Sequence, residues 1–89
     1  MAEKWMDTGV GRAQAGTLDD QAAKIKKAKA SIDDLVGQLK QVWWGEDQKR
    51  FESKWNGQYA ADLTKAATGL SKAADEIRTN AKEQDKVSG

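Results

Sequence analysis

Residues 39–55, LKQVWWGEDQKRFESKW, contain the point at which the helical pattern of the chain changes phase. Upstream, apolar residues recur at intervals of seven as far as Trp43. Continuing those rows would bury only charged and polar side chains, whereas the next apolar residues, Phe51 and Trp55, belong to a different phase. One helix cannot keep a single buried face through such a break, so the sequence predicts a turn at residues 44–46.

The chemistry of the turn supports this position. Gly45 can supply the left-handed residue that follows the first helix, and Glu46 and Asp47 would lie at the positive end of the second helix. The dipeptide Asn56-Gly57 is a competing turn signal, but it lies inside the second apolar pattern. The sequence therefore predicts Gly57 within a helix, at a cost of about 1 kcal/mol relative to alanine.

Two long helices flank the predicted turn. The patterns predict a first helix over about residues 8–43, a second over about 46–82, and a frayed tail at 83–89. Asp7 or Thr8 can cap the first helix, but the glycines that follow leave open whether it begins there or farther along. Helices of this length joined by a short turn must lie antiparallel, so a single helical-hairpin domain spans residues 1–89.

The apolar stripes are candidates both for the core and for pairing with another molecule. Alanine rows beside them would let two helix backbones approach closely. The residues predicted to pack in the core or in a dimer are Leu18, Ile25, Ile32, Leu35, Leu39, Val42, Phe51, Trp55, Tyr59, Leu63, Leu70 and Ile77. One neighbouring helix covers only part of each stripe, and a long exposed apolar stripe is unusual on a monomer. The predicted architecture is all-α, with two hairpins forming a four-helix bundle.

Composition excludes several classes of function. The chain has no cysteine or histidine, which removes the commonest zinc ligands and the commonest general base, so we expect no enzyme, metal or cofactor. The net charge of +1 argues against nucleic-acid binding, and no apolar run is long enough for membrane insertion. Charged residues near the N-terminus leave no apolar segment for a conventional signal peptide.

The tripeptide Trp43-Trp44-Gly45 at the predicted turn, followed by Phe51 and Trp55, resembles the motif of the WXG family of small type VII secretion substrates. This family includes the early secreted antigenic target of mycobacteria. The resemblance covers about residues 8–82 and rests on the motif, its central position, the chain length and the composition together.

The resemblance implies a helical hairpin that pairs with itself as a homodimer, or with a paralogous WXG hairpin as a heterodimer. It also implies secretion by a membrane ATPase without a cleaved signal peptide, from a cytoplasmic pool. Many secreted pairs carry a Tyr-x-x-x-Asp/Glu signal after the second helix, and this chain departs from that pattern because its one tyrosine, Tyr59, lies inside the helix. An intracellular helical protein-interaction module with no secretion role is the alternative that the sequence leaves open.

Overall fold

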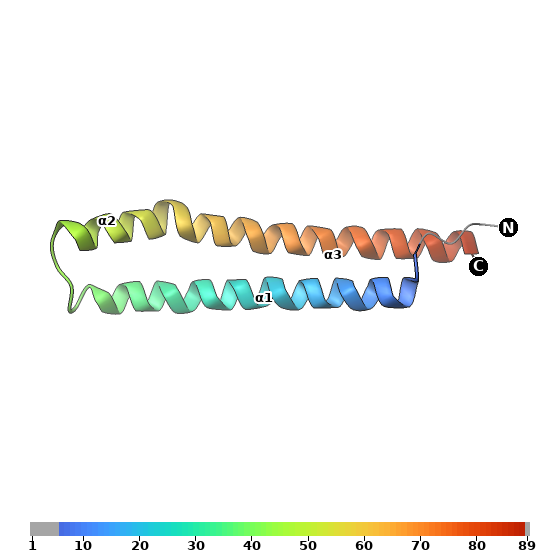
Figure 1. Cartoon of the computed structure of the whole chain (residues 1–89), viewed down its shortest axis with the longest axis horizontal. Helices are drawn as coiled ribbons and strands as arrows, with labels where there is room; N and C mark the ends of the chain where they lie inside the picture. Colours follow the sequence, from blue (N-terminus) through green and yellow to red (C-terminus); the bar gives the residue numbers. More distant parts are fainter. Residues whose placement is uncertain (1–5, 89) are drawn as a thin grey trace.

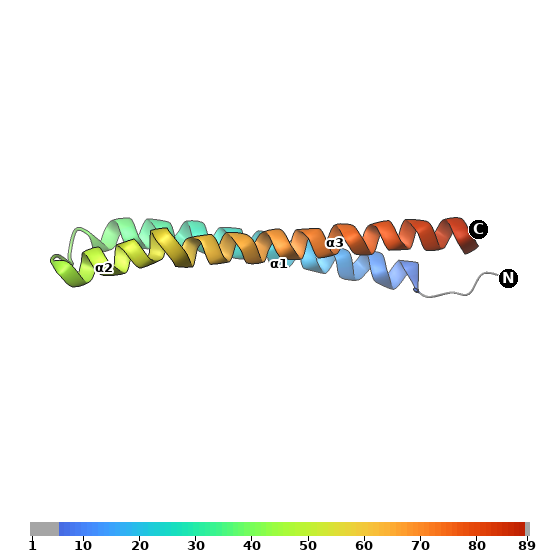
Figure 2. The same cartoon turned by 90° about the horizontal axis from the view of Figure 1, so that it is seen from above.

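The computed structural model describes residues 6–88 and shows a hairpin of two long helical arms (Figure 1). The first arm is α1, Thr8–Leu39. The second arm consists of α2, Glu46–Lys54, a π-helical turn η1, Trp55–Tyr59, and α3, Ala60–Ser88. The hairpin measures 69 × 16 × 12 Å, and its arms cross at a shallow angle (Figure 2). The all-α hairpin predicted from the sequence is therefore present.

A side-chain cap fixes the start of α1. The carboxylate of Asp7 accepts a hydrogen bond from the backbone N–H of Val10 at 3.1 Å, which satisfies one of the free donors of the first turn. The helix then runs through Gly9, Gly11 and Gly16 without interruption. The start near residue 8 agrees with the earlier of the two starting points that the sequence leaves open.

The first helix ends at Leu39, four residues before the predicted end at Trp43. Beyond Leu39 the backbone tightens, because Gln41 and Val42 each donate to the carbonyl three residues earlier, both at 3.1 Å. The chain then leaves the helix, and the ring of Trp43 packs against Phe51 with 5.6 Å between the ring centroids. The connection therefore spans residues 40–45, and the predicted turn at 44–46 covers only its last part.

Gly45 precedes α2 with φ +104° and ψ −169°, a backbone conformation that is essentially restricted to glycine. The prediction that Gly45 has a positive φ is thus correct, but its role differs. Gly45 is the first flanking residue of α2 and not the residue that ends α1. Glu46 and Asp47 lie in the first turn of α2, as predicted, where the helix dipole favours acidic side chains.

The second arm is not the single regular α-helix predicted over 46–82, because η1 adds one residue to its register. Gln48 and Trp55 are buried and Glu52 is half-buried between them, with steps of four and three. The next buried residue is Ala60, five positions after Trp55, and its N–H donates to the Trp55 carbonyl. This wider turn absorbs the extra residue, so Gly57 is helical, as predicted, but within a π turn.

The C-terminal segment is helical, and the frayed tail predicted at 83–89 is wrong over the described residues. Gln84 is fully buried, and the Arg12 guanidinium binds the carboxylate of Asp85 at 2.5 Å, which ties the end of α3 to α1. The burial of Gln84 and the ion pair of Asp85 explain why this segment is helical, and neither can be recognised from the local sequence pattern. Gly89 lies outside the described residues.

The seam between the arms is filled mainly by alanine. Large side chains are concentrated near the turn, where Val36, Trp55 and Ala60 form a buried cluster. Most of the predicted core residues lie at the edges of the seam and are half-buried. Among the described residues, the buried apolar ones are Ala15, Ala22, Val36, Trp55, Ala60, Ala67, Ala74 and Ala81.

Candidate interaction surface

One flank of the seam is closed by polar contacts between the arms. Arg12 binds Asp85, and Asp19 binds Arg78. Nearer the turn, the Lys40 ammonium binds the Glu52 carboxylate at 2.7 Å. The partners from α1 and its C-terminal flank belong to one row, Arg12, Asp19, Lys26, Asp33 and Lys40, whose charge alternates in sign at every step of seven.

Helix geometry places the apolar rows on the opposite flank. In α1, the charged row follows the buried row Ala15, Ala22 and Val36 by four residues, and the row Leu18, Ile25, Ile32 and Leu39 follows it by three. Four residues rotate a side chain about 40° to one side of the buried row, and three residues rotate it about 60° to the other. The same relation holds in α3, where Arg78 and Asp85 belong to the charged flank.

We define the apolar face by four rows of side chains on this opposite flank. The two inner rows, beside the seam, are half-buried. The two outer rows are mostly exposed and face away from the other arm. The inner rows are Leu18, Ile25, Ile32 and Leu39 with Leu63, Leu70 and Ile77; the outer rows are Ala28, Leu35 and Val42 with Tyr59, Ala66 and Ala73.

The largest exposed side chains of the apolar face lie near the turn. Leu35 is 54% exposed, Val42 71% and Tyr59 43%. At the end of α1 and in the connection, a shallow hollow is lined by Leu35, Leu39 and Val42, together with Gln38 and Gln41. Tyr59 is exposed because the π turn places Ala60, and not the tyrosine, in the seam. The apolar face therefore combines an open hollow at the end of α1 with an exposed aromatic ring on the other arm.

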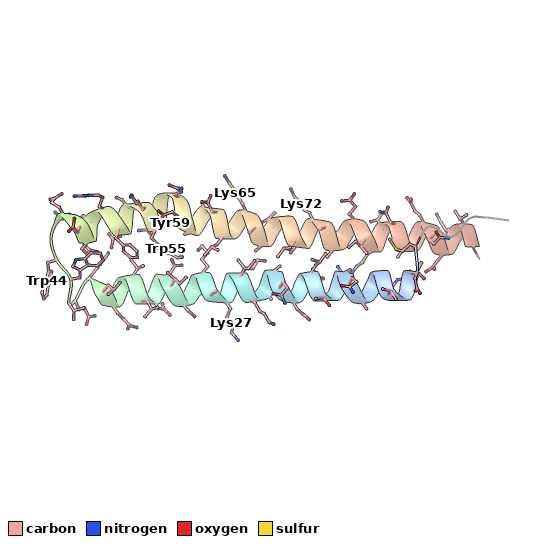
Figure 3. All side chains as sticks on the ribbon, viewed as in Figure 1. Lys27, Trp44, Trp55, Tyr59, Lys65 and Lys72 are labelled. Carbon is pink, nitrogen blue, oxygen red and sulfur yellow. The ribbon has the colours of Figure 1, made fainter. Side chains whose placement is uncertain are left out.

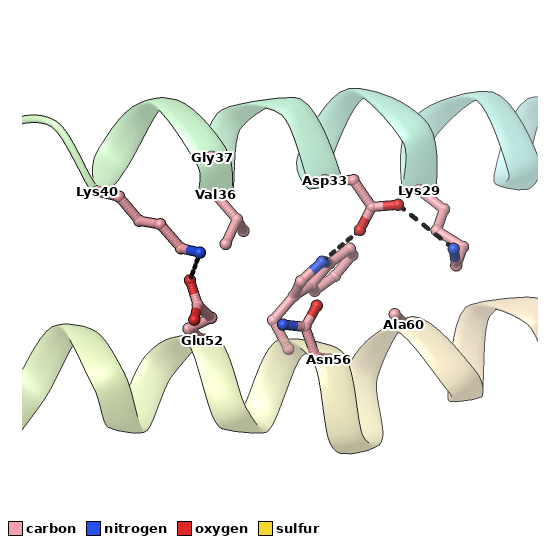
Figure 4. A pocket seen from close by; sticks show the side chains of 9 residues that line it. Lys29, Asp33, Val36, Gly37, Lys40, Glu52, Asn56 and Ala60 are labelled. Atoms are coloured by element: carbon pink, nitrogen blue, oxygen red, sulfur yellow. Dashed lines mark hydrogen bonds and ion pairs between the residues drawn. The ribbon is translucent and has the colours of Figure 1, made fainter.

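Trp55 anchors the turn end of the seam. It is 5% exposed, and its indole N–H donates to the Asp33 carboxylate at 2.7 Å (Figures 3 and 4). This hydrogen bond holds the pKa of Asp33 below its ordinary value of 3.8. Partial desolvation opposes the shift, and the Lys29 ammonium, 3.4 Å from the other carboxylate oxygen, reinforces it.

A cavity on the charged flank lies beside this anchor. It is lined by the Lys29–Asp33 and Lys40–Glu52 pairs (Figure 4) and by Trp55. Both carboxylates are already engaged by these neighbours. The lining of the cavity is therefore mixed, polar and apolar. Of its two ion pairs, only Lys40–Glu52 links the two sides of the hairpin, because Lys29 and Asp33 both lie on α1.

The three motif residues have different environments in the connection. Trp43 is half-buried against Phe51, whereas Trp44 is 74% exposed and points away from the arms at the tip of the hairpin (Figure 3). Gly45 supplies the positive φ that directs the chain into α2. The structure brings Trp43, Phe51 and Gly45 together at the turn, and it leaves the Trp44 indole available to a partner.

Sequence reasoning missed two features of this surface. The alternating row from Arg12 to Lys40 was a readable signal for the charged flank, because complementary charges recur in the other arm. The five-residue step from Trp55 to Ala60 was harder to find. The steps of four that join Phe51, Trp55, Tyr59 and Leu63 drift by about 40° each, which hides the extra residue in what resembles a continuous stripe.

Among the described residues, no helix is both long enough and apolar enough to cross a membrane. Within the same part of the chain, no three acidic side chains gather as metal ligands would. Comparison with protein-family models, curated proteins and solved structures finds no match for this chain.

Proposed function

We propose that this chain is a non-enzymatic substrate or adaptor of a type VII secretion system. It acts by pairing its apolar face with a second hairpin in a four-helix bundle, as a homodimer or with a paralogous WXG hairpin. It is secreted without a cleaved signal peptide, from a cytoplasmic pool, by a membrane ATPase. The observation that carries the proposal is the Trp43-Trp44-Gly45 tripeptide at the connection of two long antiparallel arms.

Two features of the hairpin support this role. Gly45 has a conformation that other residues rarely adopt, which gives a structural reason for glycine at the last position of the motif. The apolar face runs along both arms with half-buried inner rows, as expected for one half of a bundle whose second half covers it. The exposed Trp44 at the tip lies outside that face and is available to the secretion machinery.

Export can be tested by comparing the native bacterium with an isogenic strain that lacks the secretion ATPase. We expect the chain in the culture medium of the first strain and only in the cells of the second. Trp44→Ala should reduce export while the circular dichroism spectrum stays unchanged, because Trp44 contributes little to packing. Lys27→Ala, which alters an exposed side chain on the outer side of α1, is the matched control (Figure 3). Retention of the wild-type chain in both strains would favour an intracellular interaction module.

A further inference from the structure

We propose that the charged flank carries a binding site for a short chain of phosphate groups, at a level where the two arms share no ion pair. The site consists of the ammonium groups of Lys26, Lys65 and Lys72 and the hydroxyls of Thr68 and Ser71. It lies on the flank opposite the apolar face, so it stays open when two hairpins pair. The inference goes beyond the proposed function and does not depend on it.

The ion pairs between the arms recur every seven residues, and one of them is absent. The two pairs nearest the termini show that seven residues forward on α1 correspond to seven residues back on α3. From Asp19, which binds Arg78, the next step places Lys26 level with Ser71. Serine supplies no charge there, and Lys26 makes no hydrogen bond or ion pair with any residue in the described range 6–88. The four other members of its row are all engaged.

Positive charge is concentrated at this level of the hairpin. Residues 21–32 of α1 and 63–74 of α3, which lie at about the same level, contain six lysines and no acidic residue. The segments on either side of them contain more acidic than basic residues. The net charge of +1 therefore conceals a basic middle between two acidic ends. An anion that fits this distribution is short, because a long polyanion or a planar anionic membrane would also meet the acidic ends.

The α3 groups of the site lie within two helical turns. Thr68 and Ser71 follow the buried Ala67 by one and four residues, which places both on the charged flank. Lys65 and Lys72 lie farther from the seam, on the side of α3 that faces away from α1 (Figure 3). They are seven residues apart, about 10 Å along the helix. The hydroxyls therefore lie between these two lysines on one side and Lys26 of α1 on the other.

None of these groups is engaged within the described part of the chain. Thr68, Lys65 and Lys72 are exposed, Ser71 is half-buried, and all four lack a hydrogen bond or ion pair with another described residue. The hydroxyl of Thr64, in contrast, donates to the carbonyl of Ala60 at 3.1 Å. The flexible lysine side chains can turn toward the hydroxyls to meet a ligand.

The remaining lysines of the basic middle do not belong to the site. Lys29 binds Asp33, and Lys24 and Lys27 lie on the outer side of α1, which Figure 3 shows for Lys27. Three ammonium groups and two hydroxyls thus converge from the two arms.

The chemistry of these groups favours phosphates. A phosphate offers several strong acceptor oxygens, and lysine binds it as a point charge. A chain of phosphates places several charges within the roughly 10 Å that the site spans. The arginine fork that suits a carboxylate is absent from residues 21–32 and 63–74. These segments also contain no aromatic residue on which a nucleic-acid base could stack. A ligand that bridges Lys26 and Lys72 would join the arms where an ion pair is absent.

Binding can be measured by NMR, by following the backbone amides of the full chain while inorganic tripolyphosphate is added. We expect saturable shifts at Lys26, Thr68 and Ser71 at about 0.1 M salt, where charges are screened beyond about 10 Å. The absence of saturable shifts at these amides with millimolar tripolyphosphate would overturn the proposal. Tighter binding to a single-stranded oligonucleotide, or to vesicles that contain phosphatidylglycerol, would overturn the assignment to a short anion.

Two adjacent lysines provide a matched pair of variants. Lys26→Gln should raise the dissociation constant for tripolyphosphate about tenfold, as expected for the loss of one charge-assisted contact. Lys27→Gln removes the same charge from the outer side of α1 and should change the constant less than twofold. Equal losses would show general attraction to the basic middle and would contradict a defined site.

Ser71→Glu places a carboxylate level with Lys26 and completes the series of ion pairs. This variant should weaken tripolyphosphate binding more than about tenfold, because the new carboxylate repels the ligand and occupies its partner. Its thermal midpoint should lie above that of Ser71→Gln, which has the same shape without the charge. Circular dichroism verifies that both variants remain helical. Binding by Ser71→Glu as tight as that of the wild type would show that the anion binds elsewhere.

Discussion

At the turn end of the hairpin the seam is filled by large side chains, whereas toward the termini it is filled by alanine methyl groups. Trp55 and Val36 are buried near the turn, and Ile32, Phe51 and Leu63 pack against them. Beyond Ala60, every buried apolar residue of α3 is an alanine. Ion pairs tie the terminal half together. The hydrophobic stabilisation within one chain is therefore concentrated near the turn, and the alanine seam brings the arms close without burying much area.

The largest expected effect comes from comparing two single-residue deletions, one in the alanine seam and one in the π turn. Deleting Gly69 rotates the rest of α3 by about 100° relative to α1, which turns Ala74 and Ala81 out of the seam. We expect the free energy of unfolding to fall by more than about 5 kcal/mol. Deleting Gly57 instead restores a four-residue step from Trp55 to Ala60, and thermal unfolding should stay within a few degrees of the wild type or rise. Equal damage from both deletions would refute the assignment of η1 as a one-residue insertion.

Trp55→Ala removes the largest side chain at the turn end of the seam. We expect a loss of about 3–5 kcal/mol in the free energy of unfolding, as for other buried aromatics. Trp44→Ala is the control, and it should change stability by less than about 0.5 kcal/mol because the ring is mostly exposed. Denaturant titration at one fixed protein concentration gives both values. A larger loss at Trp44 would mean that the turn is packed differently.

Gly45→Ala tests the backbone of the connection and not its packing. With φ at +104°, a side chain at this position is strained although the surrounding space is open. We expect a loss of about 1–3 kcal/mol. Gly37→Ala is a suitable comparison, because Gly37 is helical and a Cβ there meets nothing within 4 Å. That variant should be stabilised by up to about 1 kcal/mol. An unchanged stability for Gly45→Ala would show that the turn relaxes to another conformation.

The smallest expected effect is on how the free energy of unfolding depends on pH. Because the Trp55 indole lowers the pKa of Asp33 in the folded chain, the unfolded chain binds this proton more readily. The stabilisation is present above the ordinary pKa of 3.8 and is lost as the pH falls through the lower folded-state value. Asp33→Asn should flatten this part of the stability profile, and Trp55→Phe should flatten it while keeping a ring in the seam. If both variants unfolded in acid along the same curve as the wild type, the proposed role of the hydrogen bond from Trp55 to Asp33 would be contradicted.

The sequence predicted the hairpin because the phase of the apolar rows changes between Trp43 and Phe51, and this signal is local. The same reasoning could not locate the end of α1, because Trp43 leaves the helix to pack on a ring eight residues later. The order of the C-terminal segment depends on contacts between distant residues such as Arg12 and Asp85. Local patterns do not report such contacts.

The candidate surface was predictable in composition but not in geometry. The apolar residues of both arms were identified from their heptad spacing, yet the spacing does not say which rows lie in the seam and which lie outside it. Alanine fills most of the seam because the arms approach closely. The larger Leu35 and Val42 lie outside the seam and are exposed. The exposure of Tyr59 depends in addition on the π turn.

If one hairpin is half of a four-helix bundle, the molar mass in solution must exceed that of one chain. Light scattering at micromolar concentration should give twice the 9.8 kDa of one chain, with dissociation on dilution and a thermal midpoint that rises with protein concentration. A mass of 9.8 kDa at every concentration, together with full helicity, would contradict the claim, because the apolar face would then be stable in water without a partner.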